Sequence, residues 1–299
     1  MYEFIKQIPF ISNCTGINEI NKGFSSDKKY IIHMKDDSKV LLRMFDLEEL
    51  KIKQNEFYIL EKMKETNVNC SRPIEIGEVE GHGYMITSYI EGKDAEDEIR
   101  NYSEQEQFDL GYQAGKELNK MHKISAPSHI SSWYSRKVEK HQKYMEAYLR
   151  CGIKIIHDHK ILNFIDDHIE LMKQRPNVFQ HDDFHPGNMI VKDGKLAGII
   201  DFNRYDWGDP IHEFLKIGIF TREISIPFSK GQIKGYFNNQ EPSEDFWRLY
   251  SLYMAMCVFS TVVWTINTIP HNLNEMLDKV YQFLDDHNYF DTFKPTWYE

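Results

Sequence analysis

The residues best suited to chemistry are concentrated at positions 181–188, which read HDDFHPGN. This segment carries carboxylates at Asp182 and Asp183 and an amide at Asn188, and a further carboxylate, Asp201, follows an apolar run. A carboxylate can accept the proton of a hydroxyl group when the two lie within hydrogen-bond distance. Carboxylate and amide oxygens are also ligands of Mg²⁺, which takes the rest of its shell from phosphate and water. These residue types suit proton transfer from a hydroxyl group and the binding of Mg²⁺ alongside phosphate oxygens.

The segment between Asn188 and Asp201 predicts a β-hairpin. An Asp-Gly pair at 193–194 separates two apolar runs, which is a strong short-range signal for a two-residue turn. Counting outward from that turn pairs Asn188 with Ile199, so Asp201 lies two residues past that partner on the same face. Diagonal neighbours of this kind are about 7–8 Å apart, and their side chains can converge. We therefore expect an amide oxygen and a carboxylate at the open end of the hairpin.

The elements that must position these residues form two parts. Residues 30–34 and 40–44 flank a polar turn and predict a hairpin, the stretch 47–64 has helical spacing, and 84–90 predicts a strand. After Gly92, helical patterns dominate apart from the Asp-Gly hairpin. We predict an α+β protein whose residues 1–88 form a small β-rich domain and whose residues 89–299 form a larger, mostly helical domain.

The catalytic-type segment also resembles a known family. The order His181-x-Asp183-x₄-Asn188, followed by a hairpin and Ile-Ile-Asp-Phe at 199–202, is similar to the catalytic loop and metal-binding aspartate of kinases. The runs HDDFHPGNMIV and GIIDFNRYDWGDP resemble the aminoglycoside phosphotransferase and choline kinase-like family. Gly-Asp-Pro at 208–210, together with the absence of an Ala-Pro-Glu segment, favours this branch over protein kinases. The resemblance implies a bilobal protein kinase-like fold with a β-rich N-lobe and a helical C-lobe.

The resemblance covers most of the chain and implies a nucleotide site in the N-lobe. Arg43 takes the position of the strand lysine that contacts the α- and β-phosphates, and a guanidinium can bind phosphate with two hydrogen bonds. Glu56 is the expected ion-pair partner of Arg43, with Glu48 or Glu49 as the rival. The other residues implied to bind the nucleotide are in the phosphate-covering loop and the hinge: Gly23, Ser25, Ser26, Thr87, Ser88 and Ile90.

The mechanism that the resemblance implies is in-line phosphoryl transfer. Asp183 would accept or orient the proton of a substrate hydroxyl, while Asn188 and Asp201 would hold Mg²⁺ against the phosphates of ATP or GTP. Glu213 is a candidate for contact with the acceptor substrate, with a helix or loop tether as the alternative. For Asp209, which precedes Pro210 and an apolar run, we expect a helix N-cap.

The same residues also allow other classes of function. The triplet His-Asp-His at 157–159 and the pair His-Asp at 181–182, with Asp201, allow a metal phosphohydrolase of the His-Asp type. His181 with His185 would also allow a zinc site. Pro186 and the glycine after it argue against a helix that presents both histidines on one face. We instead expect His181 to be buried and structural. A nucleotide-binding scaffold without activity is disfavoured because all three kinase-type residues are present.

Composition limits the partners. The 299 residues carry 46 acidic and 36 basic side chains, a formal charge of −10, and no concentrated basic patch, so a nucleic-acid partner is not expected. The four cysteines form no CxxC pair, and neither a signal peptide nor a membrane span is indicated. We expect a cytoplasmic protein that is a monomer or a weak dimer.

The final part of the chain bears on the acceptor. Residues 236–299 hold nine acidic and three basic residues and fifteen aromatics. An acidic, aromatic wall would suit a small cationic hydroxyl acceptor, most simply an aminoglycoside antibiotic, which would make the protein a resistance enzyme. A helical core with an acidic exterior explains the same counts. Macrolides, choline, homoserine and other sugars remain alternative acceptors.

Overall fold

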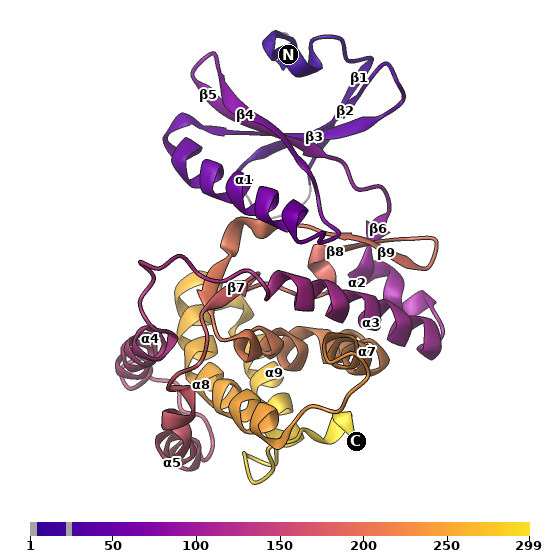
Figure 1. Ribbon diagram of the computed structural model, residues 1–299. Helices are drawn as coiled ribbons and strands as arrows, with labels where there is room; N and C mark the ends of the chain where they lie inside the picture. The colour runs from indigo at the N-terminus through magenta and orange to yellow at the C-terminus, as the bar shows by residue number, and fades with distance from the viewer. Residues whose placement is uncertain (1–4, 22–25) are drawn as a thin grey trace. The chain divides into compact units, whose positions relative to one another are not determined.

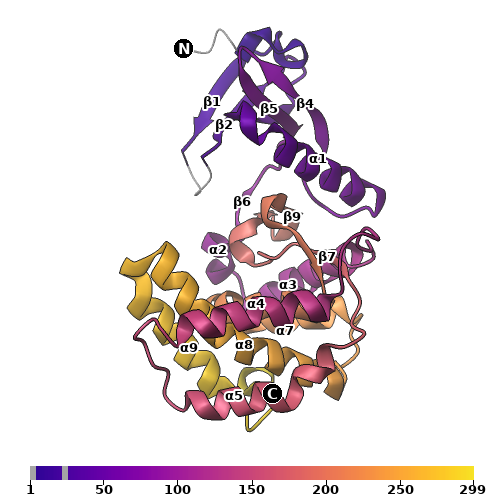
Figure 2. The ribbon, with the colours of Figure 1, turned by 90° about the vertical axis from the view of Figure 1, so that its left-hand side faces the viewer.

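A computed structural model describes residues 5–21 and 26–299. The chain forms two compact units (Figures 1 and 2). The first comprises Met1–Ala95 and Asn188–Arg204, and the second comprises Glu96–Gly187 and Tyr205–Glu299. The α+β architecture expected from the sequence is confirmed. The Asp-Gly hairpin, which we assigned with the helical domain, groups instead with the first unit, while the functional roles given to the two domains stay predictions.

The described strands of the first unit include an antiparallel sheet in the order β1-β2-β3-β5-β4. The strands are β1 Gly16–Ile20, β2 Lys28–His33, β3 Lys39–Asp46, β4 Pro73–Val79 and β5 His82–Ser88. The expected β2–β3 hairpin forms, with Ile31 opposite Leu41. The helix expected at 47–64 is α1, Leu50–Glu65.

Alternation along the strands gives this sheet two different faces. Tyr30, Ile32, Leu42 and Ile86 lie on one face, in a buried cluster with the isoleucines of the N-terminal residues 5–11. Arg43 belongs to the opposite face because its neighbour Leu42 belongs to that cluster. It contacts α1, which packs against β4 and β5.

The hairpin that carries the kinase-type residues belongs to a second sheet of the first unit, in the order β6-β8-β9. Its strands are β6 Lys93–Asp94, β8 Met189–Lys192 and β9 Lys195–Ile199. Glu91 fixes this sheet to the larger one, since its carboxylate contacts Lys39 at 2.7 Å and Lys192 at 2.9 Å. The short helix that follows Asp201, Phe202–Arg204, packs against α1.

The second unit is mostly helical. Its helices are α2 Ala95–Glu98, α3 Glu104–Met121, α4 Trp133–Tyr148, α5 Asp158–His168, α6 Arg222–Ile224, α7 Ile226–Tyr236, α8 Glu244–Thr268 and α9 Leu273–Asp286. Two short strands, β7 Val178–Gln180 and β10 Asp206–Gly208, pair antiparallel beside the loop at 181–187. Short 3₁₀ turns and a π-helical turn at Ile217–Thr221 connect these elements.

The contact between α3 and α7 depends on glycines spaced four residues apart on each helix. A Cβ added to Gly115 would lie 2.0 Å from the carbonyl oxygen of Gln232, and one added to Gly235 would lie 2.0 Å from that of Tyr112. Backbones that approach this closely leave no room for a side chain. The two helices therefore pack with their backbones in close contact in the second unit.

Helix α8 is the center of the second unit's core. It is long and apolar enough to cross a membrane by length and composition, but 78% of its most apolar window, of mean hydropathy 1.6, is buried within the protein. It contacts α4, α5 and α9, as expected for a helix that is apolar on all sides.

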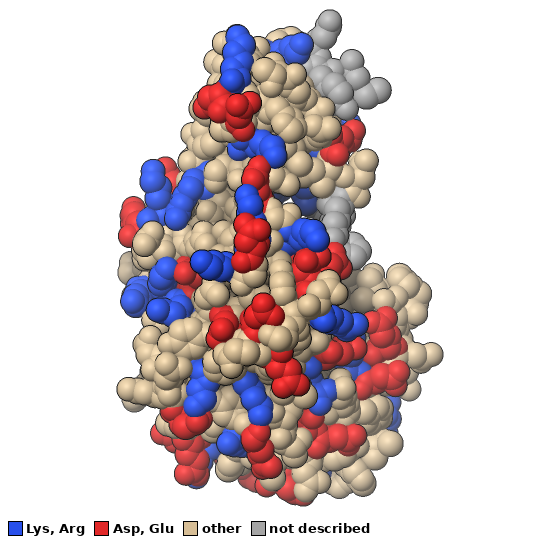
Figure 3. All heavy atoms as spheres, turned by 90° about the vertical axis from the view of Figure 1, so that its right-hand side faces the viewer, with Lys and Arg blue, Asp and Glu red and all other residues tan. Residues whose placement is uncertain are grey.

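On the face in Figure 3, acidic and basic side chains of the described residues are interspersed.

Candidate active site

In the first unit, Arg43 is held by two carboxylates. Its Nη1 lies 2.5 Å from Oε1 of Glu56, and its Nη2 lies 2.6 Å from Oδ2 of Asp27. The predicted partner Glu56 is therefore the one the structure selects. Its rival Glu49 instead lies 3.5 Å from Lys53, and Glu48 is exposed.

Sequence reasoning missed two members of this group. Asp27 accepts hydrogen bonds from the Nζ of Lys53 at 2.7 and 2.8 Å as well as from Arg43. Burial raises the pKa of Asp27, but Arg43 and Lys53 outweigh it and hold the pKa below its usual value. Lys53 precedes Glu56 by three residues on α1, so the two lie on the same side of the helix, and this spacing could have identified Lys53 from the sequence. We call Asp27, Arg43, Lys53 and Glu56 the arginine cluster.

The remaining predicted nucleotide residues belong to the expected phosphate-covering loop and to the hinge. Gly23 and Ser25 lie outside the described residues, and Ser26 is exposed just before β2. Thr87 is buried and pairs with Leu41 near the end of β5. Ser88, also predicted for the hinge, ends β5, and its hydroxyl accepts the Arg72 N–H at 2.8 Å. Ile90, the last predicted hinge residue, is half-buried beside Gly198.

The predicted metal ligands are neighbours in the first unit, but the expected register is wrong. Lys192 pairs with Lys195 as expected, but an irregularity then shifts the register so that Met189 pairs with Ile199. The Ile200 N–H donates to the carbonyl of Asn188 at 3.0 Å. Asp201 therefore follows directly after the partner of Asn188.

Asp201 leaves the strand at once, because its backbone is left-handed, with φ of 67°. Such a conformation is costly for a non-glycine residue and is commonly retained at functional sites. Its side chain is exposed and that of Asn188 is half-buried. An amide and a carboxylate on adjacent backbone positions fit Mg²⁺, which takes few protein ligands when phosphates and water supply the rest. Among the described residues, no group of three or more His, Cys, Asp or Glu side chains is suited to hold a metal.

In the second unit, Asp183 lies in the loop after β7 and is contacted by two nitrogen donors. His185 Nε2 lies 3.4 Å, and Lys216 Nζ 3.3 Å, from Oδ1 of Asp183. The Gly187 N–H donates to Nδ1 of His185 at 3.2 Å, which leaves the ring proton on Nε2, toward Asp183. Burial raises the pKa of Asp183, but His185 and Lys216 together hold it well below its usual range. Asp183 is therefore ionised at neutral pH.

Glu213, a buried carboxylate, holds the loop that carries Asp183 through a hydrogen bond to the loop backbone. This side chain is 2% exposed, and its Oε2 accepts the N–H of Asp182 at 3.2 Å. Asp182 itself has a left-handed backbone, with φ of 59°. Burial raises the pKa of Asp182 to about 6, against the opposing effect of Lys216. This placement supports the loop-tether alternative for Glu213, and its contact with the acceptor stays a prediction.

Two structural roles expected from the sequence are confirmed. Asp209 is fully buried and caps the helical turn Pro210–Phe214 by accepting the Ile211 N–H at 3.0 Å. It also accepts two hydrogen bonds from Arg175, at 2.7 and 3.0 Å, and one from Tyr253 at 2.7 Å. His181 is buried against the ring of Phe184.

Sequence reasoning also missed Lys216, which contacts Asp183, and the basic residues near it. Lys216 contacts Asp183 directly, and His212, four residues earlier, accepts a hydrogen bond at 2.8 Å from the Nζ of Lys137 on α4. Lys140 lies one turn further along α4 and is exposed. We call Lys137, Lys140, His212 and Lys216 the lysine cluster. Its members come from two segments that are far apart in the sequence, so they give no local motif.

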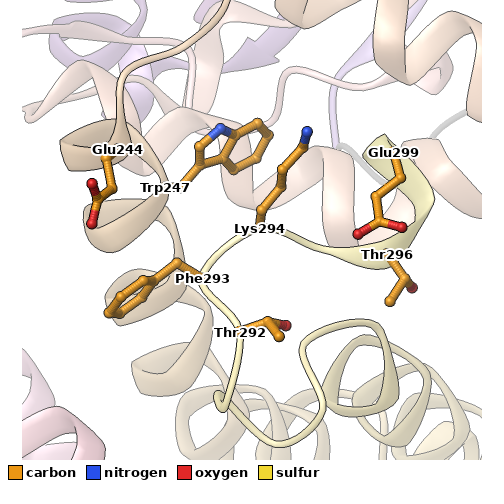
Figure 4. A pocket seen from close by; sticks show the side chains of 7 residues that line it. All are labelled: Glu244, Trp247, Thr292, Phe293, Lys294, Thr296 and Glu299. Carbon is orange, nitrogen blue, oxygen red and sulfur yellow. The ribbon is translucent and has the colours of Figure 1, made fainter.

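The aromatic residues near the C-terminus do not form an exposed wall. Trp247, Tyr250, Tyr253 and Trp297 are all buried in the core of the second unit, which supports the alternative of a helical core with an acidic exterior. A hollow of about 500 Å³ lies between the start of α8 and the C-terminal segment (Figure 4). None of the predicted site residues lines it; the lining residues are Glu244, Trp247, Thr292, Phe293, Lys294, Thr296 and Glu299.

Comparison with protein families gives one match, to a model described as the phosphotransferase enzyme family, APH, which matches residues 16–250. Among curated proteins, none matches the sequence.

Solved structures share the fold at low identity. One is a ternary complex of a thermostable mutant of the aminoglycoside phosphotransferase APH(4)-Ia with ADP and hygromycin B, 13% identical, with a TM-score of 0.67, covering 95% of this chain and 98% of that one. A second is the streptomycin-ATP-APH(2")-IIa ternary complex, 16% identical, with a TM-score of 0.64 and 95% of each chain covered. A third, from Haemophilus somnus 129PT, is described provisionally as a fructosamine-3-kinase; it is 14% identical, with a TM-score of 0.64, covering 95% of this chain and 98% of that one.

Proposed function

Because the chain belongs to the APH phosphotransferase enzyme family and is a kinase-like small-molecule phosphotransferase, we propose that it transfers the γ-phosphoryl group of ATP or GTP to a hydroxyl group of a small molecule. The relatives bind ADP in one complex and ATP in another, which supports a nucleoside triphosphate as the donor.

The observation that carries the proposal is the state of Asp183. The His185 and Lys216 contacts orient its carboxylate and keep it ionised. In the proposed reaction, Asp183 accepts a hydrogen bond from the acceptor hydroxyl and takes its proton as the hydroxyl oxygen bonds to the γ-phosphorus. The bond from that phosphorus to the β–γ bridging oxygen breaks, and the nucleoside diphosphate leaves. Positioning and charge supply most of the rate in such a reaction.

The first unit supplies the donor side of this proposal. Arg43 is fixed by Asp27 and Glu56, and its positive charge would stand against the nucleotide phosphates. Asn188 and Asp201 are the residues that would hold Mg²⁺. When bound, Mg²⁺ neutralises charge on the phosphate oxygens.

The identity of the acceptor is a finer question. An aminoglycoside is the acceptor that the sequence favoured, and relatives are described in complex with hygromycin B and streptomycin, which supports it. Fructosamine is the acceptor implied for another structural neighbour. The lysine cluster instead favours an acceptor that carries an anionic group. A role in antibiotic resistance would require that the acceptor is an aminoglycoside.

The test is release of ADP or GDP in the presence of Mg²⁺ with a panel of acceptors. The panel holds aminoglycosides, a macrolide, choline, homoserine, sugars and sugar acids, and the variant Asp183→Asn is the control. We expect one acceptor class to stimulate release from the wild type but not from the variant. Equal stimulation of both proteins would contradict the role of Asp183, and saturable nucleotide binding without any stimulated release would favour a scaffold.

A further inference from the structure

Three lysines, Lys137, Lys140 and Lys216, lie near the loop that carries Asp183, and within the described residues only Lys216 has a carboxylate oxygen within 4.0 Å. The carboxylates of Asp182, Asp206 and Glu213 act on this region from farther away. Lys216 lies on the helical segment that begins at Pro210, and its Nζ is 3.3 Å from Oδ1 of Asp183. Its side chain is 24% exposed. His212 is one turn earlier on the same segment, so it stands next to Lys216 along the helix surface. This segment therefore connects Asp183 to α4 through His212.

On α4, Lys137 is held in a fixed position by His212. The Nζ of Lys137 donates to Nε2 of His212 at 2.8 Å and lies over the rings of Trp133 at 5.7 Å and Tyr253 at 5.9 Å. The His212 ring is packed edge-on against the same two rings. Because Nε2 accepts, the neutral ring carries its proton on Nδ1, and this buried atom has no hydrogen-bond partner among the described residues. An ammonium ordered in this way loses little conformational freedom when an anion binds.

The two α4 lysines lack the carboxylate partners that surface lysines commonly have. Within the described residues, no Asp or Glu oxygen lies within 4.0 Å of Lys137 or Lys140, whereas Lys143 on the same helix contacts Glu139 at 2.6 Å. Burial, together with the neighbouring charge of Lys140, lowers the pKa of Lys137 to about 8, against the opposing effect of Asp182 and Asp206. Burial, with Lys137 and Lys140, also keeps the pKa of His212 well below its usual value, so His212 stays neutral.

The field of these lysines reaches the loop that carries Asp183. Lys216 and Lys140 both act to lower the pKa of Asp182, the residue beside Asp183, and Asp182 in turn acts to raise the pKa of Lys137. Like charges gathered in a partly desolvated place repel each other, and a bound anion would relieve that repulsion. The ammonium groups of a polycationic acceptor would add to it.

We propose that the acceptor carries, besides its reactive hydroxyl, an anionic group that Lys137 and Lys140 of α4 bind together with Lys216. This inference rests on the proposed phosphotransferase function. The shared chemistry of the anion is that of a carboxylate or a phosphate monoester. The acceptor class is thus a hydroxy acid or a phosphorylated polyol, and the residues of α4 determine specificity rather than perform the transfer.

A binding experiment tests this site without knowledge of the substrate. The protein is saturated with AMP-PNP and Mg²⁺, so that the nucleotide phosphates are in place, and inorganic sulfate is titrated by calorimetry. We expect saturable binding of sulfate, weakened about tenfold in Lys140→Gln and in Lys137→Gln, because each loses one charge-assisted contact to the anion. Lys143→Gln, on the same helix but paired with Glu139, is the matched control and should bind sulfate as the wild type does.

Lys140 is exposed, so its variant tests the site even if Lys137→Gln unfolds. Sulfate that does not bind saturably, or that binds all variants equally, would overturn the proposal. So would an equal loss in Lys143→Gln, because the effect would then be that of the helix's net charge.

An acceptor assay separates this inference from the proposed function. Transfer is measured with glucose, gluconate, glucose 6-phosphate and kanamycin. We expect the gluconate or the phosphate compound to exceed glucose at least tenfold, with sulfate competing against the acceptor, and the two arms distinguish a carboxylate from a phosphate. Asp183-dependent transfer to kanamycin above all others would overturn the anion site while leaving the phosphotransferase intact. Sulfate binding that depends on Lys140, without transfer to any acceptor of the wider panel, would support the anion site and contradict the proposed function.

Discussion

The arginine cluster of the first unit and the lysine cluster of the second both contain basic side chains, but they differ in burial and in the number of carboxylates that contact those side chains. In the arginine cluster, two cations and two carboxylates are all buried, with each residue at most 9% exposed, and they are linked in the order Glu56, Arg43, Asp27, Lys53. In the lysine cluster, three lysines and a neutral histidine are partly exposed, and the described carboxylate in contact is that of Asp183.

The difference shows that the charge balance of a cluster indicates whether the cluster positions one of its own side chains or binds a ligand. A buried ion group whose charges cancel is costly to disturb, so it fixes the geometry of Arg43. A partly exposed group with surplus charge attracts a ligand of the opposite sign. On this account, the first cluster positions one side chain, and the second binds part of the substrate.

The largest expected effect is that of Asp183→Asn. The amide cannot take the proton of the acceptor hydroxyl, so we expect kcat/KM to fall about a thousandfold while nucleotide affinity is unchanged. Steady-state kinetics and nucleotide titration measure the two quantities. Asp193→Asn is the control, because Asn-Gly is as suited to that hairpin turn as Asp-Gly. Comparable activity of the two variants would contradict the assignment.

The balance of the arginine cluster predicts a large loss of stability in Asp27→Asn. Removing this carboxylate leaves Lys53 and part of the Arg43 guanidinium without their buried partner, so we expect the free energy of unfolding to fall by about 3–5 kcal/mol. Denaturant unfolding measures this. Lys140→Gln in the lysine cluster should change it by no more than about 0.5 kcal/mol. Equal losses would remove the distinction between the clusters.

Lys216→Met should act on the pH dependence of transfer. Lys216 is one of the groups that hold the pKa of Asp183 down, so its removal raises that pKa. The carboxylate is then protonated at a higher pH, and the acidic limb of the kcat/KM profile moves upward by about one pH unit. An unmoved limb would show that Lys216 does not influence Asp183 during turnover. Lys279→Met, whose lysine contacts the same ring of Phe220, serves as control.

The smallest expected effect concerns Asp182. Its pKa is about 6 in the folded protein, above the ordinary value of 3.8. Between these values the folded protein binds a proton that the unfolded chain does not, so the contribution of Asp182 to stability rises as the pH falls from 7 to 5. In Asp182→Asn that part of the rise should vanish. Unfolding free energies at pH 7 and pH 5 for the two proteins measure it, and identical pH dependence would contradict it.

Much of the fold followed from local patterns. The β2–β3 hairpin, α1 and the Asp-Gly hairpin were predicted because alternation, helical spacing and turn residues are properties of short segments. The irregularity in β9 was not, since nothing near Ala197 marks it, and it moved Asp201 by one position relative to Asn188.

The candidate site was predictable where a motif or a short spacing identified its members. Asp183, Asn188 and Asp201 lie in contiguous motifs, and Glu56 lies at a suitable place on a helix. The contact of Asp27 with Arg43, and that of Lys137 with His212, join segments that only the tertiary fold brings together. The charge of the acceptor side was therefore judged from the composition of residues 236–299, most of whose aromatics are buried in the core, although Trp264 is 38% exposed.

The most direct test of the account is ³¹P nuclear magnetic resonance of the wild type with Mg²⁺, ATP and, in turn, gluconate, glucose 6-phosphate, glucose and kanamycin. The account predicts a new phosphate monoester resonance with an anionic acceptor, formed faster than with the neutral or cationic ones and absent in Asp183→Asn. A monoester formed fastest on kanamycin, or one that persists in Asp183→Asn, would contradict it.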